Sequence, residues 1–175
     1  MKYLSDLQLG PSMIEYVTLN GPRATQRQIN NFVKLVREGD AVAERYVRNG
    51  IRRKGAKMVM AITKHAVVGV AALKVPLKSY RDGIESEAKS GYLIPEDKYP
   101  FELGYVAVSA DHGGKGIGKA LVNNVLELAD GHGLFATTSH PAMKKSILPT
   151  AGLKPVGTSW LNPQNSLLQL FIFDI

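Results

Sequence analysis

Apolar positions between residues 101 and 131 predict a strand, a loop and a helix in direct succession. Residues 101–108 read Phe-Glu-Leu-Gly-Tyr-Val-Ala-Val, which has the aromatic and β-branched content of a strand. Residues 113–119 then read Gly-Gly-Lys-Gly-Ile-Gly-Lys. The apolar residues that follow recur at the spacing of one helix face: Leu121, Val122, Val125, Leu126, Leu128 and Ala129. We therefore expect a strand that runs through a glycine-rich loop into a helix.

This arrangement is suited to holding an anion. Glycine lets backbone N–H groups turn inward, and the start of a helix offers unpaired N–H groups and the positive end of its dipole. Lys115 and Lys119 add positive charge at the same place. The sequence therefore predicts a phosphorylated ligand at residues 113–119.

Two known phosphate loops fit these residues poorly. A nucleotide-triphosphatase loop would need Ser or Thr after Lys119 to hold Mg²⁺, and the chain has Ala120 there. A dinucleotide-binding loop needs its last glycine one position later than Gly118, and normally comes with repeated βαβ units.

Residues 102–131 resemble the acyl-CoA signature of the GNAT N-acetyltransferase superfamily, whose loop pattern is Arg/Gln-x-x-Gly-x-Gly/Ala. The resemblance implies that acetyl-CoA is the acyl-donor substrate and that no metal takes part. It implies a pantetheine arm along Val106, Ala107 and Val108. It also implies a pyrophosphate held by the loop residues Gly113, Gly114, Lys115, Gly116, Ile117, Gly118 and Lys119. Gly113 stands where the family usually has Arg or Gln, so one side-chain contact is missing and we expect weaker binding.

The fold that the resemblance implies is α/β (α+β), with a mixed, mostly antiparallel sheet of six or seven strands flanked by about four helices. We expect one domain over residues 1–175, with a lead-in at 1–12 and an insertion at 77–100 that either shapes the acceptor channel or is surface loop. Apolar runs predict the other strands at residues 14–19, 57–63, 67–75, 134–139, 156–160 and 167–173. Helices are expected at 25–39, at 40–50 with Asp40 as its cap, and at 142–150.

Glu102 is the best candidate for the general base that an amine acceptor requires. It precedes Val106 by four residues, a register at which some GNAT members carry their base, and strand periodicity would put residues 102, 104 and 106 on one face. The alternative is a structural carboxylate at the start of the strand, either exposed to solvent or paired with a lysine. The usual tyrosine acid has no counterpart, because Leu148 takes its position, so His140, Ser139 or a tyrosine of the insertion would have to replace it.

Composition narrows the remaining choices. The chain has no cysteine, and no stretch approaches a membrane span, so we expect a cytoplasmic protein without disulfides or membrane contact. The net charge is +7, and its one basic cluster lies in residues 45–57. That cluster is either a solvated helix end and loop or a contact for nucleic acid, such as RNA, or for another large anion.

We therefore expect an acetyl-CoA-dependent N-acetyltransferase that acts on a primary amine of a small molecule or a peptide by direct attack. Two alternatives stay open: a toxin-like acetyltransferase acting on aminoacyl-tRNA, and a catalytically weak acyl-CoA-binding regulatory module. The acceptor, and whether the protein forms a homodimer, cannot be read from the sequence.

Overall fold

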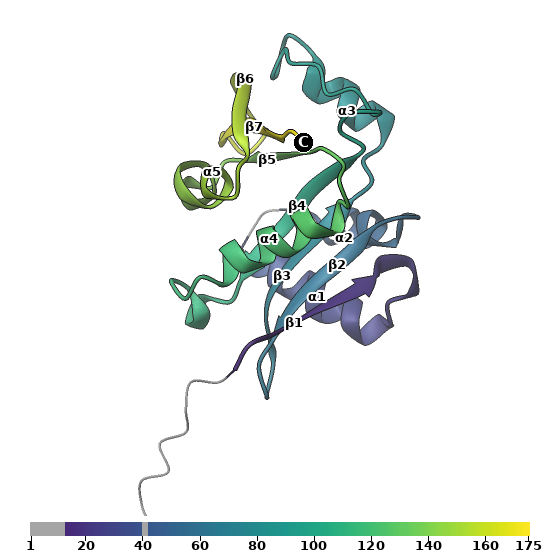
Figure 1. Cartoon of the computed structure of the whole chain (residues 1–175), viewed down its shortest axis with the longest axis vertical. Helices are drawn as coiled ribbons and strands as arrows, with labels where there is room; N and C mark the ends of the chain where they lie inside the picture. Colours follow the sequence, from purple (N-terminus) through teal and green to yellow (C-terminus); the bar gives the residue numbers. More distant parts are fainter. Residues whose placement is uncertain (1–12, 40–41) are drawn as a thin grey trace, which may run out of the picture.

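A seven-stranded mixed sheet forms the centre of the protein (Figure 1). The computed structural model describes residues 13–39 and 42–175. Its strands are β1 (Glu15–Asn20), β2 (Lys57–Ile62), β3 (Val67–Lys74), β4 (Phe101–Val108), β5 (Leu134–Thr138), β6 (Lys154–Leu161) and β7 (Leu167–Phe173). They lie in the order β1-β2-β3-β4-β5-β7-β6, and every neighbouring pair is antiparallel except β4 and β5. The predicted mixed, mostly antiparallel sheet is confirmed.

Five α-helices accompany the sheet in the described residues, where about four were expected. They are α1 (Gln26–Gly39), α2 (Glu44–Arg52), α3 (Lys78–Glu85), α4 (Ile117–Leu128) and α5 (Leu148–Thr150), which a π-helical turn at Met143–Ile147 precedes. Asp40 lies outside the described residues, and α2 begins at Glu44. On α2 Val47 and Ile51 are buried, whereas Tyr46 is exposed.

Helices cover both faces of the sheet's first half (Figure 1). The alternation within β2 explains this arrangement. Met58 and Met60 pack with α1 and α2, and Val59 and Ala61 pack with α4 on the opposite face. The strand is therefore apolar throughout, as expected for one that is buried on both sides.

The insertion at 77–100 is a packed element rather than a surface loop. It carries α3, and its Ile84, Ile94 and Tyr99 form a third apolar cluster with residues of β5, β6 and β7. Inside it the buried Arg81 guanidinium donates to the carbonyls of Ile94 and Tyr99, at 2.7 and 2.8 Å. The insertion thus covers the second half of the sheet.

Helix α4 approaches β3 closely at Gly69. A Cβ at that residue would lie 2.9 Å from Ile117 Cγ2 and 3.0 Å from Leu121 Cδ1. The strand pairing also shifts register beside it, between Ala61 and Ile62. None of the helices described is long and apolar enough to cross a bilayer.

Candidate active site

The parallel strands β4 and β5 separate soon after they begin. Their pairing consists of Phe101 with Leu134 and Glu102 with Phe135. From Leu103 onward the two strands diverge, and the β5–β7–β6 part of the sheet turns away from β4 (Figure 1). The edge of β4 that faces β5 is therefore open to accept backbone hydrogen bonds from a ligand.

A β-bulge at Tyr105 accompanies this separation. Val70 of β3 pairs with Ala107, and Ala72 pairs with Gly104. One residue lies between the two paired positions on β3 and two residues lie between them on β4, so β4 has one extra residue. Tyr105 takes a φ of 56°, which is unusual for a bulky residue. Its hydroxyl donates to the carbonyl of Tyr46 at 3.2 Å, which helps to hold this backbone conformation.

The bulge changes which side chains share a face. Glu102 pairs across the strands with Lys74 on the face of α1 and α2, whereas Val106 packs against the α4 side. The expectation that residues 102 and 106 share a face is therefore wrong, because the extra residue at the bulge reverses the alternation. Val108 also packs toward α4, and Ala107 toward α1 and α2.

The glycine-rich loop leaves a row of backbone donors unpaired. Gly114 and Gly116 have φ of 71° and 77°, and a Cβ on either would meet nothing within 4 Å. Gly116 is the N-cap of α4. In the part of the chain that the structure describes, the N–H groups of residues 114–119 donate to no protein acceptor, and Ala120 N–H is the first bonded to the new helix turn.

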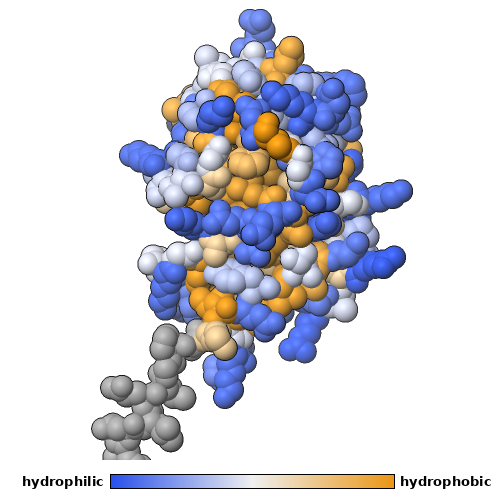
Figure 2. All heavy atoms as spheres, in the orientation of Figure 1, coloured by the Kyte–Doolittle hydropathy of each residue, from blue (hydrophilic) through white to orange (hydrophobic). Residues whose placement is uncertain are grey.

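This row of donors fits a diphosphate. The loop is exposed, and Lys115 and Lys119 stand on it. Beside it, apolar side chains are exposed between α4 and the β5–β7 part of the molecule, in the upper half of the view (Figure 2). A ligand with a charged end and an extended, less polar arm is what such a surface accommodates.

Glu102 lies buried at the point where β4 and β5 separate, with 3% of its surface exposed. Its Oε1 accepts a hydrogen bond from the Tyr80 hydroxyl at 2.9 Å, and its Oε2 forms an ion pair with Lys74 Nζ at 2.8 Å. Within the described residues Oε2 accepts no bond of hydrogen-bond geometry, so the ion pair is what compensates its burial. The structure thus places the predicted base beside a lysine, inside the molecule rather than on its surface.

Charge and burial act together on the partners of Glu102. Burial is the largest single influence on Lys74 and lowers its pKa, but the Glu102 carboxylate, Tyr80 and Tyr105 together outweigh it, so the net pKa is raised and the amine stays charged. The pKa of Tyr80 is raised first by burial of its hydroxyl and then by the Glu102 charge. At neutral pH the Lys74 amine is therefore charged and the Tyr80 phenol is neutral.

Gly104 allows Lys74 to reach this site. The Lys74 stem crosses β4 at Gly104, where a Cβ would lie 2.5 Å from its Cδ. The ammonium then stands 4.5 Å from the ring centroid of Tyr105 and 5.5 Å from that of Tyr80. Any larger residue at position 104 would displace the lysine.

The other candidates for proton transfer lie apart from Glu102 or are buried. His140 is exposed at the start of the segment that follows β5, and its backbone N–H donates to Thr138 Oγ1. Leu148 has no exposed surface and packs in the core behind α4. A proton donor at that position is therefore absent.

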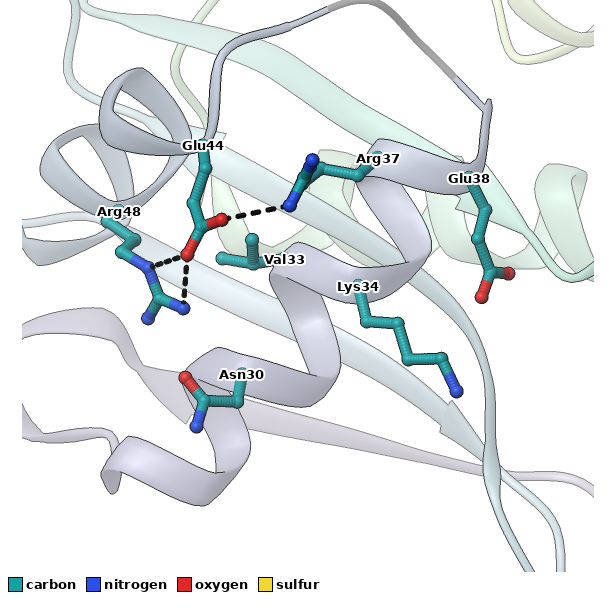
Figure 3. A pocket seen from close by; sticks show the side chains of 7 residues that line it. All are labelled: Asn30, Val33, Lys34, Arg37, Glu38, Glu44 and Arg48. Carbon is teal, nitrogen blue, oxygen red and sulfur yellow. Dashed lines mark hydrogen bonds and ion pairs between the residues drawn. The ribbon is translucent and has the colours of Figure 1, made fainter.

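Several basic side chains of the segment 45–57 have partners within the protein. Arg48 pairs with Glu44, which also pairs with Arg37 from α1. These residues line a hollow of about 360 Å³ between the two helices (Figure 3). Arg53 donates to the carbonyl of Val75 at 2.7 Å. The hollow lies over exposed ion pairs and away from the glycine-rich loop.

Sequence reasoning did not identify Lys74 and Tyr105 as parts of this site, and it offered Tyr80 only as one of several tyrosines in the insertion. Each comes from a different element, namely the end of β3, helix α3 and the β4 bulge. The one usable signal was Gly104 in the middle of an apolar strand, since an interior strand glycine often marks a bulge or a close approach.

Three solved structures have a fold similar to that of this protein. Escherichia coli ElaA has a TM-score of 0.69 at 14% identity, over 93% of this chain and 100% of that one. An IAA acetyltransferase from Bacillus cereus gives 0.62 at 16%, over 93% and 100%. The ribosomal-protein-S18-alanine N-acetyltransferase from Escherichia coli gives 0.65 at 11%, over 93% and 94%. At these identities the likeness shows the fold.

The sequence supplies the family. A search of curated proteins found no significant match. The model of the acetyltransferase (GNAT) family matches residues 37–147, which is more than half of the chain and includes β4, the glycine-rich loop and α4. The chain therefore belongs to the acetyltransferase (GNAT) family of enzymes.

Proposed function

We propose that this protein transfers the acetyl group of acetyl-CoA to a primary amine by direct attack. The observation that carries the proposal is the divergence of β4 from β5 directly before the exposed loop with its unpaired N–H groups. The loop, residues 113–119, holds the pyrophosphate, and the open edge of β4 at Val106, Ala107 and Val108 holds the pantetheine arm. This brings the thioester to the gap between the strands.

Glu102 acts as the general base in this proposal. An amine must be neutral to attack a carbonyl carbon, so a group near the gap has to take its proton, directly or through water. Glu102 is at the point of separation, and its Oε2 lies 2.8 Å from the Lys74 amine. His140 stands at the end of β5 with its side chain in solvent, where it would meet the acceptor rather than the thioester.

Binding of CoA is the first test. Calorimetry with CoA should show a single site, and Gly114→Val should weaken it, because valine disfavours a φ of 71° and moves the loop donors. Gly131→Val is the matched control, since its φ is 77°, its Cβ would also meet nothing, and it lies after α4. Failure of millimolar CoA to bind the wild-type protein would refute the proposal.

Turnover is the second test. Acetyl-CoA is mixed with spermidine, with tyramine or with short peptides that have a free N-terminus, and release of the CoA thiol is followed. Peptides are included because two similar structures are a ribosomal-protein-alanine N-acetyltransferase and a NatC complex bound to Gag peptide and CoA. Glu102→Gln should lower the rate and change its pH profile while CoA still binds. An unchanged profile would remove Glu102 as the base.

Leu148 favours a second candidate function, a module that binds acyl-CoA without turnover. Its full burial leaves no proton donor at the usual tyrosine position. CoA binding without thiol release for any amine tested would support this second function.

A further inference from the structure

Tyr80 lies where the two separating strands begin to open. It comes from α3, in the insertion, and its hydroxyl donates to Glu102 on β4. The side chain of Thr137, on β5 beyond the last paired residue, also acts on this hydroxyl and favours its ionised form. Tyr80 is 40% exposed as a whole residue, whereas burial of its hydroxyl raises its pKa.

No other described tyrosine hydroxyl contacts Glu102. Tyr105 is on the same face, but its hydroxyl is bonded to the carbonyl of Tyr46. The Tyr99 hydroxyl donates to Asp174, the residue that follows β7. Tyr80 is therefore the hydroxyl that shares both the thioester gap and the proposed base.

We propose that Tyr80 protonates the departing CoA sulfur and is itself reprotonated by Glu102. This proposal rests on the proposed function, because it needs the thioester in the gap between β4 and β5. It makes the insertion part of the catalytic site, in place of the residue that Leu148 does not supply.

The proposed reaction balances in bonds and protons. The neutral amine attacks the carbonyl carbon, a C–N bond forms, the C–S bond breaks, and its electron pair leaves on sulfur. Glu102 takes one proton from the attacking nitrogen. Tyr80 gives its O–H proton to sulfur, and Glu102 passes its new proton to the Tyr80 oxygen. The products are an amide and a thiol, and both side chains return to their starting states.

The resting hydrogen bond prepares this sequence. While Glu102 is ionised, the Tyr80 proton points to its Oε1 and cannot leave. Once Glu102 holds a proton, it donates to the Tyr80 oxygen instead, which frees the phenol proton to turn toward sulfur. Protonation of Glu102 also removes the charge that helps to raise the pKa of Tyr80, so the phenol becomes a better donor at the moment of need.

Tyr80→Phe tests this role, with the amine that gives the fastest thiol release among spermidine, tyramine and the peptides. We expect kcat to fall about 100-fold, the range for loss of a general acid, with the KM for acetyl-CoA unchanged. Since the two residues form one relay, Glu102→Gln/Tyr80→Phe should be no slower than the slower single variant. A purely structural tyrosine would instead give losses that multiply.

Tyr92→Phe is the matched control, because it makes the same change in the same insertion within the apolar cluster with Ile84 and Phe135. It should keep the wild-type rate. A Tyr80→Phe protein with a wild-type rate, or a double variant with the product of both losses, would overturn the relay and leave the proposed function standing. Absence of thiol release from the wild-type protein with every amine would overturn both.

Discussion

Replacing Lys74 by methionine probes the buried ion pair on which the site depends. Methionine keeps the unbranched stem that crosses Gly104 and removes the ammonium 2.8 Å from Glu102 Oε2. The side chains of Lys74 and Glu102 are 17% and 4% exposed. In the variant Oε2 is buried without a partner, and only the Tyr80 bond to Oε1 remains.

Loss of one partner from a buried pair costs about 3–5 kcal/mol. Because Lys74 is partly exposed and Tyr80 still bonds the carboxylate, we expect the lower end, about 3 kcal/mol at pH 7. Removing both charges with Lys74→Met/Glu102→Leu should bring the stability back to within about 1 kcal/mol of wild type, since no unpaired charge is left.

Urea unfolding measured by fluorescence gives the free energies, because the chain has a single tryptophan, Trp160, which lies buried in the third apolar cluster. The pKa of Lys74 is raised in the folded protein, so its contribution should be complete below about pH 10 and decline only at higher pH. A single variant within about 0.5 kcal/mol of wild type at pH 7 would show that water reaches this pair and would refute the reasoning.

Three further predictions concern the loop, α4 and the insertion. Gly114→Val and Gly131→Val should each lose about 1–2 kcal/mol of stability for a positive φ, but only the first should weaken CoA binding, which thermal unfolding and calorimetry separate. Gly69→Val should lose about 1–3 kcal/mol in urea unfolding, because its Cβ has no room beneath α4; full stability would mean that α4 can shift. Arg81→Met should leave the carbonyls of Ile94 and Tyr99 without their donor, so hydrogen exchange should accelerate across residues 86–100 and stay unchanged in β2.

The local features of the fold were readable from the sequence. A strand, a glycine-rich loop and a helix follow one another between residues 101 and 131, and each carries its own short-range pattern. The strands β2, β3, β6 and β7 were predicted in the same way, from apolar runs. Hydrophobic period and glycine placement depend on near neighbours alone, so no knowledge of tertiary contacts was needed.

The insertion shows where this reasoning stops. Its sequence looks like loop, because its charges, prolines and tyrosines have no clear period. In the folded chain Ile84, Ile94 and Tyr99 pack against apolar residues of β5, β6 and β7. The nearest of these in sequence, Phe135, is more than 35 positions after Tyr99. Burial against a distant surface therefore ordered a segment whose own propensity is weak.

The amino-acid sequence by itself determined the strand–loop–helix unit and, through the glycines, the unpaired N–H groups that mark it as a site for a diphosphate. Only the tertiary structure decided what stands around Glu102, because Lys74, Tyr80 and Tyr105 reach it from three separate elements. It also decided the faces of β4, since one extra residue at Tyr105 reverses the alternation that a strand pattern assumes. Side-chain period is a property of neighbours in sequence, whereas a catalytic group is made by neighbours in space.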